Sequence, residues 1–218
     1  MDLTYEVLKE HQREIRDGFP EGLALRTHRA LSWLQRAEME NDLDAKFIFQ
    51  WVAFNAADAH EIRDRKSYSE KRLYVSFMQC LIENDSDNLF YNTIWTEFSG
   101  SIKSILENRY VFQPFWDFHN GYIEEEEWLD KFNKNKTAAK KAVGSMDTKK
   151  ALPIIFERFY VLRNQLLHGG ATWNSRVNRD QIKEGTNLLG KLIPIVIHTM
   201  MSNPNLLWGD PCYPVVKT

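Results

Sequence analysis

Apolar residues recur along most of the chain with the spacing expected for one face of an α-helix. No segment shows the alternation of apolar and polar residues that is typical of a half-buried strand. This pattern predicts an all-α fold. The helices are expected near residues 3–17, 21–40, 44–65, 67–84, 88–108, 123–143, 148–168 and 178–202.

Glycine and proline mark the expected breaks. Gly18-Phe19-Pro20 separates the first two helices, and Phe112-Gln113-Pro114-Phe115-Trp116 is expected to be an aromatic connection broken by its proline. The segment from Leu206 to Pro214 is rich in aromatic residues, so we expect this tail to dock on the body. Without a shift in composition to mark a linker, we expect one domain over residues 1–218, which ends in a tail at 203–218.

Composition narrows the class of protein further. Hydrophobic residues make up 43% of the 218 and charged residues 27%, which is ordinary for a globular domain and does not favour disorder. The two cysteines, Cys80 and Cys212, have no spacing that indicates a disulfide framework or a zinc site. There is no apolar run of about 18 residues, and the charged, amphipathic first helix does not resemble a signal peptide. We therefore expect a cytoplasmic protein without a membrane span.

Charge is distributed unevenly. The formal net charge is -2, but residues 131–183 hold 12 Lys and Arg against three acids, so this stretch carries +9 and the remainder carries -11. A basic stretch in an acidic protein is the pattern expected of a site for a polyanion such as RNA. A solvated, lysine-rich helix face is the alternative explanation.

The chemistry that best fits the basic stretch lies at the predicted helix end Arg163-Asn164-Gln165-Leu166-Leu167-His168. Asn164 and His168, four residues apart, share one face, whereas Arg163 and His168 are separated by about 140° around the axis. Unpaired carbonyls at a helix end favour a protonated imidazole, and the arginine offers a planar fork for a phosphate. Arg163, Asn164 and His168 are therefore the candidate catalytic residues for RNA cleavage by the ribose 2′-hydroxyl.

Residues that follow this helix end are suited to contact the same RNA. Gly169-Gly170 allows close approach of a ligand, and the next segment mixes cations, polar donors and an aromatic ring. The candidate RNA-binding residues are Trp173, Asn174, Arg176, Arg179 and, elsewhere in the basic stretch, Lys149.

At this motif the sequence resembles the HEPN superfamily, all-α proteins marked by an arginine and a histidine four to six residues apart. Arg163-Asn164-Gln165-Leu166-Leu167-His168 matches the common Arg-Asn-x-x-x-His form. The segment from Phe47 to Asn55 also resembles an earlier helix of some HEPN branches, which carries Trp-x-Ala-Phe-Asn. Residues 25–202 are compatible with the resemblance, so the first helix and the tail would be additions to it.

The resemblance implies an antiparallel helical bundle that forms a homodimer. Two Arg-His motifs would face each other across a cleft and cleave RNA without a metal or other cofactor. Arg163 would stabilise the phosphate, His168 would act as acid or base, and Asn164 would orient one of them. Asn55 is a candidate supporting residue, although it is equally suited to satisfying a helix crossing. Family members act as toxins with separate antitoxins, in phage defence and in RNA processing.

Two alternatives to catalysis stay open on the sequence alone. Some HEPN proteins are non-catalytic modules that bind nucleotides or proteins through the same cleft. The second alternative is that the helix end has a purely structural role, with His168 serving as its cap. Asp58, His60 and Asp64 have the residue types of metal ligands, but a surface ion pair explains their spacing better, so we expect no metal site.

Overall fold

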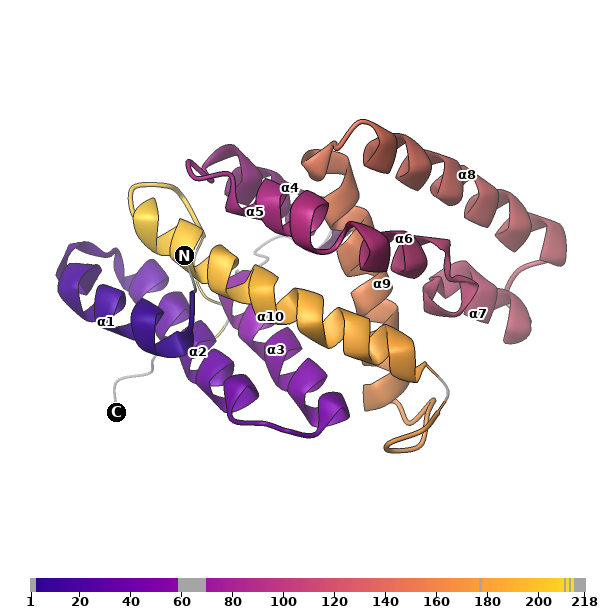
Figure 1. The fold of residues 1–218 in the computed structure, drawn as a ribbon, viewed down its shortest axis with the longest axis horizontal. Coiled ribbons are helices and arrows are strands. Elements are labelled where there is room, and N and C mark those ends of the chain that lie inside the picture. Colours follow the sequence, from indigo (N-terminus) through magenta and orange to yellow (C-terminus); the bar gives the residue numbers. More distant parts are fainter. Residues whose placement is uncertain (1–2, 59–69, 177, 210, 212, 214–218) are drawn as a thin grey trace. The chain divides into compact units, whose positions relative to one another are not determined.

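The computed structural model describes residues 3–58, 70–176, 178–209, 211 and 213. Within these ranges the regular elements are helices and no strand occurs (Figure 1), so the predicted all-α fold is confirmed. The chain divides into two compact units, Met1–Leu89 with Thr186–Thr218 (unit 1) and Phe90–Gly185 (unit 2). That the whole chain forms one domain stays a prediction.

Unit 1 is built around a helical hairpin. Its helices are α1 (Tyr5–Ile15), α2 (Glu21–Glu38), α3 (Leu43–Asp58) and α4 (Glu70–Glu83), together with most of α10 (Arg179–Ser202). α2 and α3 pack along each other and bury Leu31, Phe47 and Phe54, as their helical spacing predicts. The predicted continuation of α3 to residue 65, with His60 and Asp64, lies outside the described residues.

A buried arginine holds the tail of unit 1. Arg26 is 1% exposed, donates from Nε to the carbonyl oxygen of Ala57 at 2.9 Å, and also donates to the carbonyl oxygen of Trp208. The Trp208 ring is buried edge-on against Phe77, with 6.0 Å between ring centroids. The predicted docking of the tail is therefore confirmed at Trp208, whereas the Tyr213 side chain is 79% exposed.

Unit 2 carries the predicted motif. Its elements are α5 (Leu89–Asn92, entered at Phe90), a π-helix (Thr93–Glu97), α6 (Ser99–Glu107), a 3-10 turn called η3 (Arg109–Val111), α7 (Gln113–His119), α8 (Glu125–Gly144), α9 (Thr148–Leu167) and the first turns of α10. α9 packs against α6, α8 and η3, so the motif helix is supported from three sides.

Two predicted elements of unit 2 need correction. The single helix expected over 88–108 is interrupted by the π-helix, where the Phe98 amide donates to the Thr93 carbonyl at 3.2 Å, five residues back. The Trp95 indole in this turn donates to the Thr148 hydroxyl at 2.9 Å, a tertiary bond that local periodicity does not report. The connection expected over 112–116 is instead the start of α7, because Pro114 occupies a first-turn position where its missing N–H costs nothing.

Arg158 fixes α9 in the core of unit 2. Its side chain is 1% exposed, its guanidinium lies 4.4 Å from the Phe112 ring centroid, and it donates to the Asn135 side chain. Two longer bonds of 3.5 Å reach the carbonyl oxygens of Leu106 and Val111. Burial lowers the pKa of this guanidinium to about 10. Arg158 therefore belongs to the core and does not contribute charge to a surface site.

Candidate active site at the end of α9

The motif helix begins and ends as the sequence predicts. The Asp147 carboxylate accepts from the Lys150 amide at the first turn. At the other end Gly169 adopts φ of +68°, the Gly169 amide donates to Leu166 at 3.4 Å, and the Gly170 amide donates to Gln165 at 2.8 Å. These bonds form a Schellman motif, which places His168 at the C-cap.

Arg163 and Asn164 are joined directly. The Arg163 Nη1 donates to the Asn164 Oδ1 at 2.8 Å, and the guanidinium lies 5.8 Å from the Tyr160 ring centroid. This bond turns the arginine fork towards the helix edge that leads to His168. The Arg163 Nε is buried and has no hydrogen-bond partner within the described residues.

His168 does not contact Arg163 within the described part of one chain. The imidazole is exposed, and no hydrogen bond joins it to the arginine. Helical geometry explains the separation, since five residues correspond to about 140° around the axis. One copy of α9 therefore presents the two groups on either side of its exposed face.

An apolar stripe fills the space between those two groups. Tyr160 and Leu167 are each 50% exposed. At about 100° per residue, both lie at angles between Arg163 and His168 on the helix surface. Sequence periodicity did not single out this stripe, although the spacing of seven residues was a readable signal.

The loop after α9 is tied back to the motif helix. The Asn178 Nδ2 donates to the Gln165 Oε1 at 2.6 Å, and Asn174 and Asn178 adopt left-handed φ values of +54° and +60°. The Arg179 Nε donates to the Ser175 carbonyl at 3.1 Å, which braces the end of the loop. The loop that carries the predicted residues is therefore anchored to the motif helix through Asn178.

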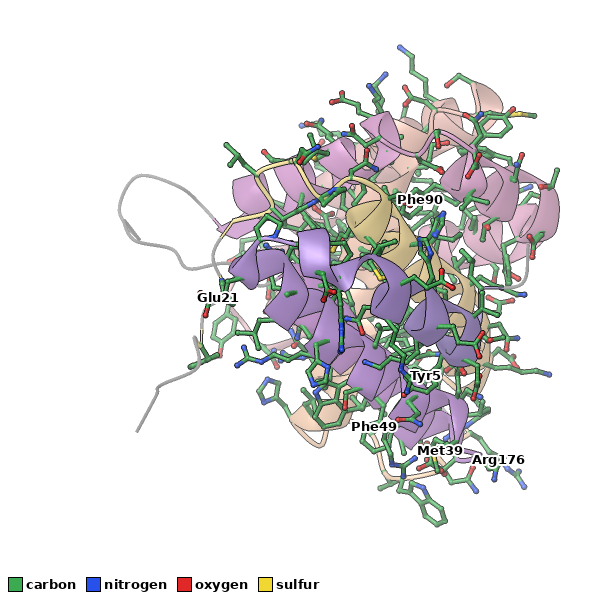
Figure 2. All side chains as sticks on the ribbon, turned by 90° about the vertical axis from the view of Figure 1, so that its left-hand side faces the viewer. Tyr5, Glu21, Met39, Phe49, Phe90 and Arg176 are labelled. Carbon is green, nitrogen blue, oxygen red and sulfur yellow. The ribbon has the colours of Figure 1, made fainter. Side chains whose placement is uncertain are left out.

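Three of the predicted RNA-binding side chains in this loop are exposed to solvent. Trp173 is 76% exposed, and Figure 2 shows Arg176 on the loop with its exposed side chain directed away from the ribbon. Asn174 is also exposed, and Arg179 is half-buried. An aromatic ring and a cation on one short loop can contact a base and a phosphate.

Lys149 lies away from the motif. It is exposed in the first turn of α9, and His168 is 19 residues further on, which corresponds to about 28 Å along the helix axis. The two residues therefore do not line one small site in a single chain, and an RNA-binding role for Lys149 requires an extended contact.

The basic stretch is partly neutralised. Lys131 pairs with Glu127 at 2.6 Å, and Lys134 pairs with Asp130 at 2.7 Å. Arg158 is buried in the core. The charge of +9 therefore overstates the density of unpaired cations at the surface of this stretch.

Asn55 lies on α3 in unit 1, whereas the motif lies in unit 2. Its side chain is half-buried. Its predicted supporting role stays a prediction.

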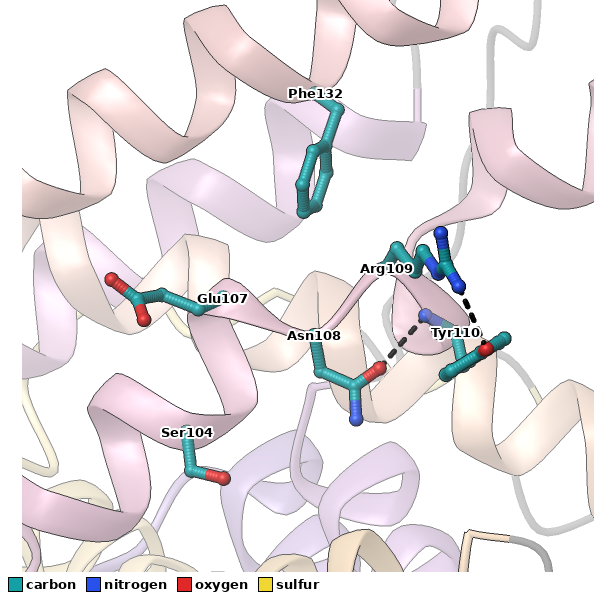
Figure 3. Close-up of a pocket in the computed structure, with 6 residues that line it drawn as sticks. All are labelled: Ser104, Glu107, Asn108, Arg109, Tyr110 and Phe132. Atoms are coloured by element: carbon teal, nitrogen blue, oxygen red, sulfur yellow. Dashed lines mark hydrogen bonds between the residues drawn. The ribbon is translucent and has the colours of Figure 1, made fainter.

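Sequence reasoning missed an open groove in unit 2 with a volume of about 430 Å³. Figure 3 shows the six lining residues, Ser104, Glu107, Asn108, Arg109, Tyr110 and Phe132. The Tyr110 carbonyl accepts from the Gln165 Nε2 at 2.8 Å, so one edge of the groove is bonded to the motif helix. The groove brings together α6, η3 and α8, which sequence spacing alone does not do.

The described residues contain no group of three or more His, Cys, Asp or Glu side chains arranged to hold a metal ion. In the same part of the chain, no helix combines the length and the apolar character that crossing a membrane requires. Comparison with known proteins found no matching family model, no matching curated protein and no matching solved structure.

Proposed function

We propose that this protein is an endoribonuclease of the HEPN type that acts as a homodimer and needs no metal. The observation that carries the proposal is the 2.8 Å bond from Arg163 to Asn164, one turn before an exposed His168 at the helix end. This bond orients an arginine fork, which can bind a phosphate, on the same helix end as an imidazole, which can act as acid or base. The HEPN resemblance adds the reaction class.

The exposed stripe on α9 supports a dimer. Tyr160 and Leu167 leave apolar surface uncovered between Arg163 and His168. A twofold contact between two such faces buries this surface and repeats every interaction in both directions. Arg163 then approaches His168 of the partner subunit, which resolves the separation of about 140° within one helix.

The proposed reaction uses the RNA's own nucleophile. A neutral His168 takes the proton from the ribose 2′-hydroxyl, and the 2′-oxygen bonds to the adjacent phosphorus. The P–O5′ bond breaks, and the protonated His168 of the partner subunit donates its proton to the departing 5′-oxygen. The products are a 2′,3′-cyclic phosphate and a 5′-hydroxyl. Arg163 binds the non-bridging phosphate oxygens, where negative charge develops.

The first experiment compares purified wild type with His168→Ala on structured RNA in EDTA. We expect the variant to lose at least about 100-fold in cleavage rate, because proton transfer by a positioned side chain contributes about that much. His28→Ala is the matched control, since His28 is an exposed histidine on α2. Absence of cleavage by the wild type, or equal cleavage by His168→Ala, contradicts the proposal.

The second experiment tests the dimer face. Leu167→Asp places a charge in the proposed interface, so we expect a shift from dimer to monomer in analytical ultracentrifugation. Leu129→Asp is the control, because Leu129 is a partly exposed leucine on α8, at 39%. A wild-type monomer at all concentrations, or a Leu167→Asp variant that stays dimeric, argues against this face.

A non-catalytic nucleotide-binding or protein-interaction module is the alternative function. The absence of a bond between Arg163 and His168 within the described chain favours it, since a binding surface does not require the two groups to meet. This alternative predicts RNA binding that survives in His168→Ala and no cleavage by the wild type.

The resemblance extends the proposal to a role as a toxin or in phage defence, with a separate antitoxin or regulator protein. Expression of wild type in a bacterial host is then expected to stop growth, and expression of His168→Ala is expected to be tolerated. Equal toxicity of the two proteins would separate any growth arrest from the proposed chemistry.

A further inference from the structure

The groove beside η3 combines an anion, a cation and an aromatic ring. Glu107 ends α6, Arg109 begins η3, and Phe132 projects from α8. In the view of Figure 3 the Glu107 carboxylate lies to the left, the Arg109 guanidinium to the right, and the Phe132 ring above and between them. A ligand that fits this order has hydrogen-bond donors at one end, a flat ring in the middle and negative charge at the other end.

Within the part of the chain that the structure describes, the Glu107 carboxylate makes no hydrogen bond or ion pair that would explain its position as a requirement of the fold. No hydrogen bond or ion pair reaches its carboxylate within the described residues, and its side chain is half-buried. It is the last residue of α6, where a negative charge is disfavoured by the helix dipole. The carboxylate is therefore free to accept hydrogen bonds from a ligand.

The other polar groups at this end of the groove are already engaged. The Ser104 hydroxyl interacts with Glu184, and this interaction lowers the pKa of Glu184 while burial, the larger influence, raises it. The Asn108 Oδ1 accepts from the Tyr110 amide at 2.8 Å and caps η3. The Glu107 carboxylate is thus the hydrogen-bond acceptor at this end of the groove that remains available to recognise a ligand.

The Arg109 side chain is held in place by its neighbours but retains N–H donors that make no hydrogen bond to the described residues of the groove. Its Nη2 donates to the Tyr110 hydroxyl at 3.0 Å, and its guanidinium lies 5.0 Å from the Tyr110 ring centroid and 5.7 Å from that of Phe115. A guanidinium has five N–H donors, so the remaining ones are available to a phosphate.

We propose that this groove binds a guanine nucleotide, either free or within an RNA chain. Guanine carries two adjacent donors, N1–H and N2–H, that match both oxygens of one carboxylate, whereas adenine offers a single donor group on the corresponding edge. The Glu107 carboxylate accepts hydrogen bonds from the base, and the Phe132 ring contacts the flat face of the base. Arg109 binds the phosphate of the nucleotide. A site whose acceptor pairs with one base binds less tightly the analogue that leaves this acceptor unpaired.

The bond from Gln165 to the Tyr110 carbonyl connects this groove to the motif helix. A guanosine bound here would select where an RNA chain is cut. That the bound nucleotide belongs to an RNA substrate rests on the proposed function, but the preference of the groove for guanine does not.

The experiment measures binding of GMP and AMP to the full chain by titration calorimetry, without magnesium. We expect GMP to bind at least tenfold more tightly than AMP. Glu107→Gln is expected to weaken GMP binding at least tenfold and to leave AMP binding unchanged. The control is Glu125→Gln, at an exposed glutamate in the first turn of α8. Arg109→Gln is expected to weaken the binding of GMP and of AMP to a similar extent. If Glu107→Gln fails to fold, this variant tests whether the nucleotides bind in the groove.

Two further measurements distinguish nucleotide binding in the groove from the proposed ribonuclease activity. His168→Ala is expected to bind GMP as the wild type does, so the groove stands even if no cleavage is found. A short RNA with one guanosine, compared with the same RNA carrying adenosine there, tests whether the base is read within a chain or only as a free nucleotide. Equal affinity for GMP and AMP, no binding of either, or no effect of Glu107→Gln and Arg109→Gln overturns the proposal while leaving the proposed ribonuclease intact.

Discussion

Arg163 donates a 2.8 Å hydrogen bond to Asn164, its neighbour in the chain, and this bond fixes the direction of the arginine fork. The guanidinium also lies 5.8 Å from the Tyr160 ring centroid. The Asn164 side chain shares a helix face with His168, four residues on. The bond therefore draws the arginine fork towards the helix face that Asn164 shares with His168.

Replacement of Asn164 tests this positioning role. Asn164→Ala is expected to lower kcat/KM for RNA cleavage by roughly 10- to 100-fold, because a small misplacement of a catalytic group has a large effect on rate. Asn164→Asp, which keeps the acceptor oxygen, is expected to recover part of the loss. Asn187→Ala is the control, since Asn187 is exposed on α10. Cleavage by Asn164→Ala at the wild-type rate would remove Asn164 from the account.

Gln165 is expected to hold the loop and the groove to α9. Its side chain donates to the Tyr110 carbonyl at 2.8 Å and accepts from Asn178 at 2.6 Å. Gln165→Ala removes both bonds, so amide hydrogen exchange over residues 169–176 and 109–111 is expected to rise several-fold while exchange in α8 is unchanged. Gln79→Ala, at an exposed position on α4, is the control. Unchanged exchange in both segments would show that the loop is held by other contacts.

The Asn135 side chain is expected to stabilise unit 2 through Arg158. Asn135→Ala leaves a buried guanidinium without its side-chain acceptor, so the free energy of unfolding is expected to fall by about 1–3 kcal/mol. Asn133→Ala, two residues earlier on the exposed face of α8, is expected to change it by less than about 0.5 kcal/mol. Urea unfolding of both variants measures the difference. Equal effects would mean that Arg158 is satisfied by its backbone contacts alone.

Acid is expected to destabilise unit 1 through His198. Burial and the nearby His11 lower the pKa of His198, and they outweigh Asp87 and Asp85, which raise it. The two imidazole centroids are 6.3 Å apart. Because the unfolded chain binds the proton more readily than the folded chain, stability should decrease as the pH falls from about 7 to 5. His198→Gln is expected to lessen this decrease in urea unfolding, and a pH dependence identical to that of wild type would contradict the assignment.

Local patterns in the sequence predicted the parts of the fold that local physics controls. The extent of α9, expected over 148–168 and observed over Thr148–Leu167, follows from residue type and helical period. The break at Thr93–Glu97 was not predictable, because it accompanies a bond between Trp95 and Thr148, 53 residues apart.

The candidate site likewise combines features that the sequence predicted with features that it could not predict. Arg163, Asn164 and His168 were identified from their spacing along one helix. The bond between Gln165 and Tyr110 joins residues 55 positions apart, so neither it nor the groove beside it had a signal in the sequence. Charge alone was misleading, since the basic stretch includes the buried Arg158 and the distant Lys149.

The most direct test of the central claim uses one RNA oligonucleotide in two forms, all-ribose and 2′-deoxy at the nucleotide before the cut, incubated in EDTA with wild type and with His168→Ala. The account predicts that wild type cuts only the all-ribose form, leaves a 2′,3′-cyclic phosphate, and is at least about 100-fold faster than His168→Ala. Cleavage of the 2′-deoxy form at the same position, equal rates for the two proteins, or no cleavage by wild type would contradict it.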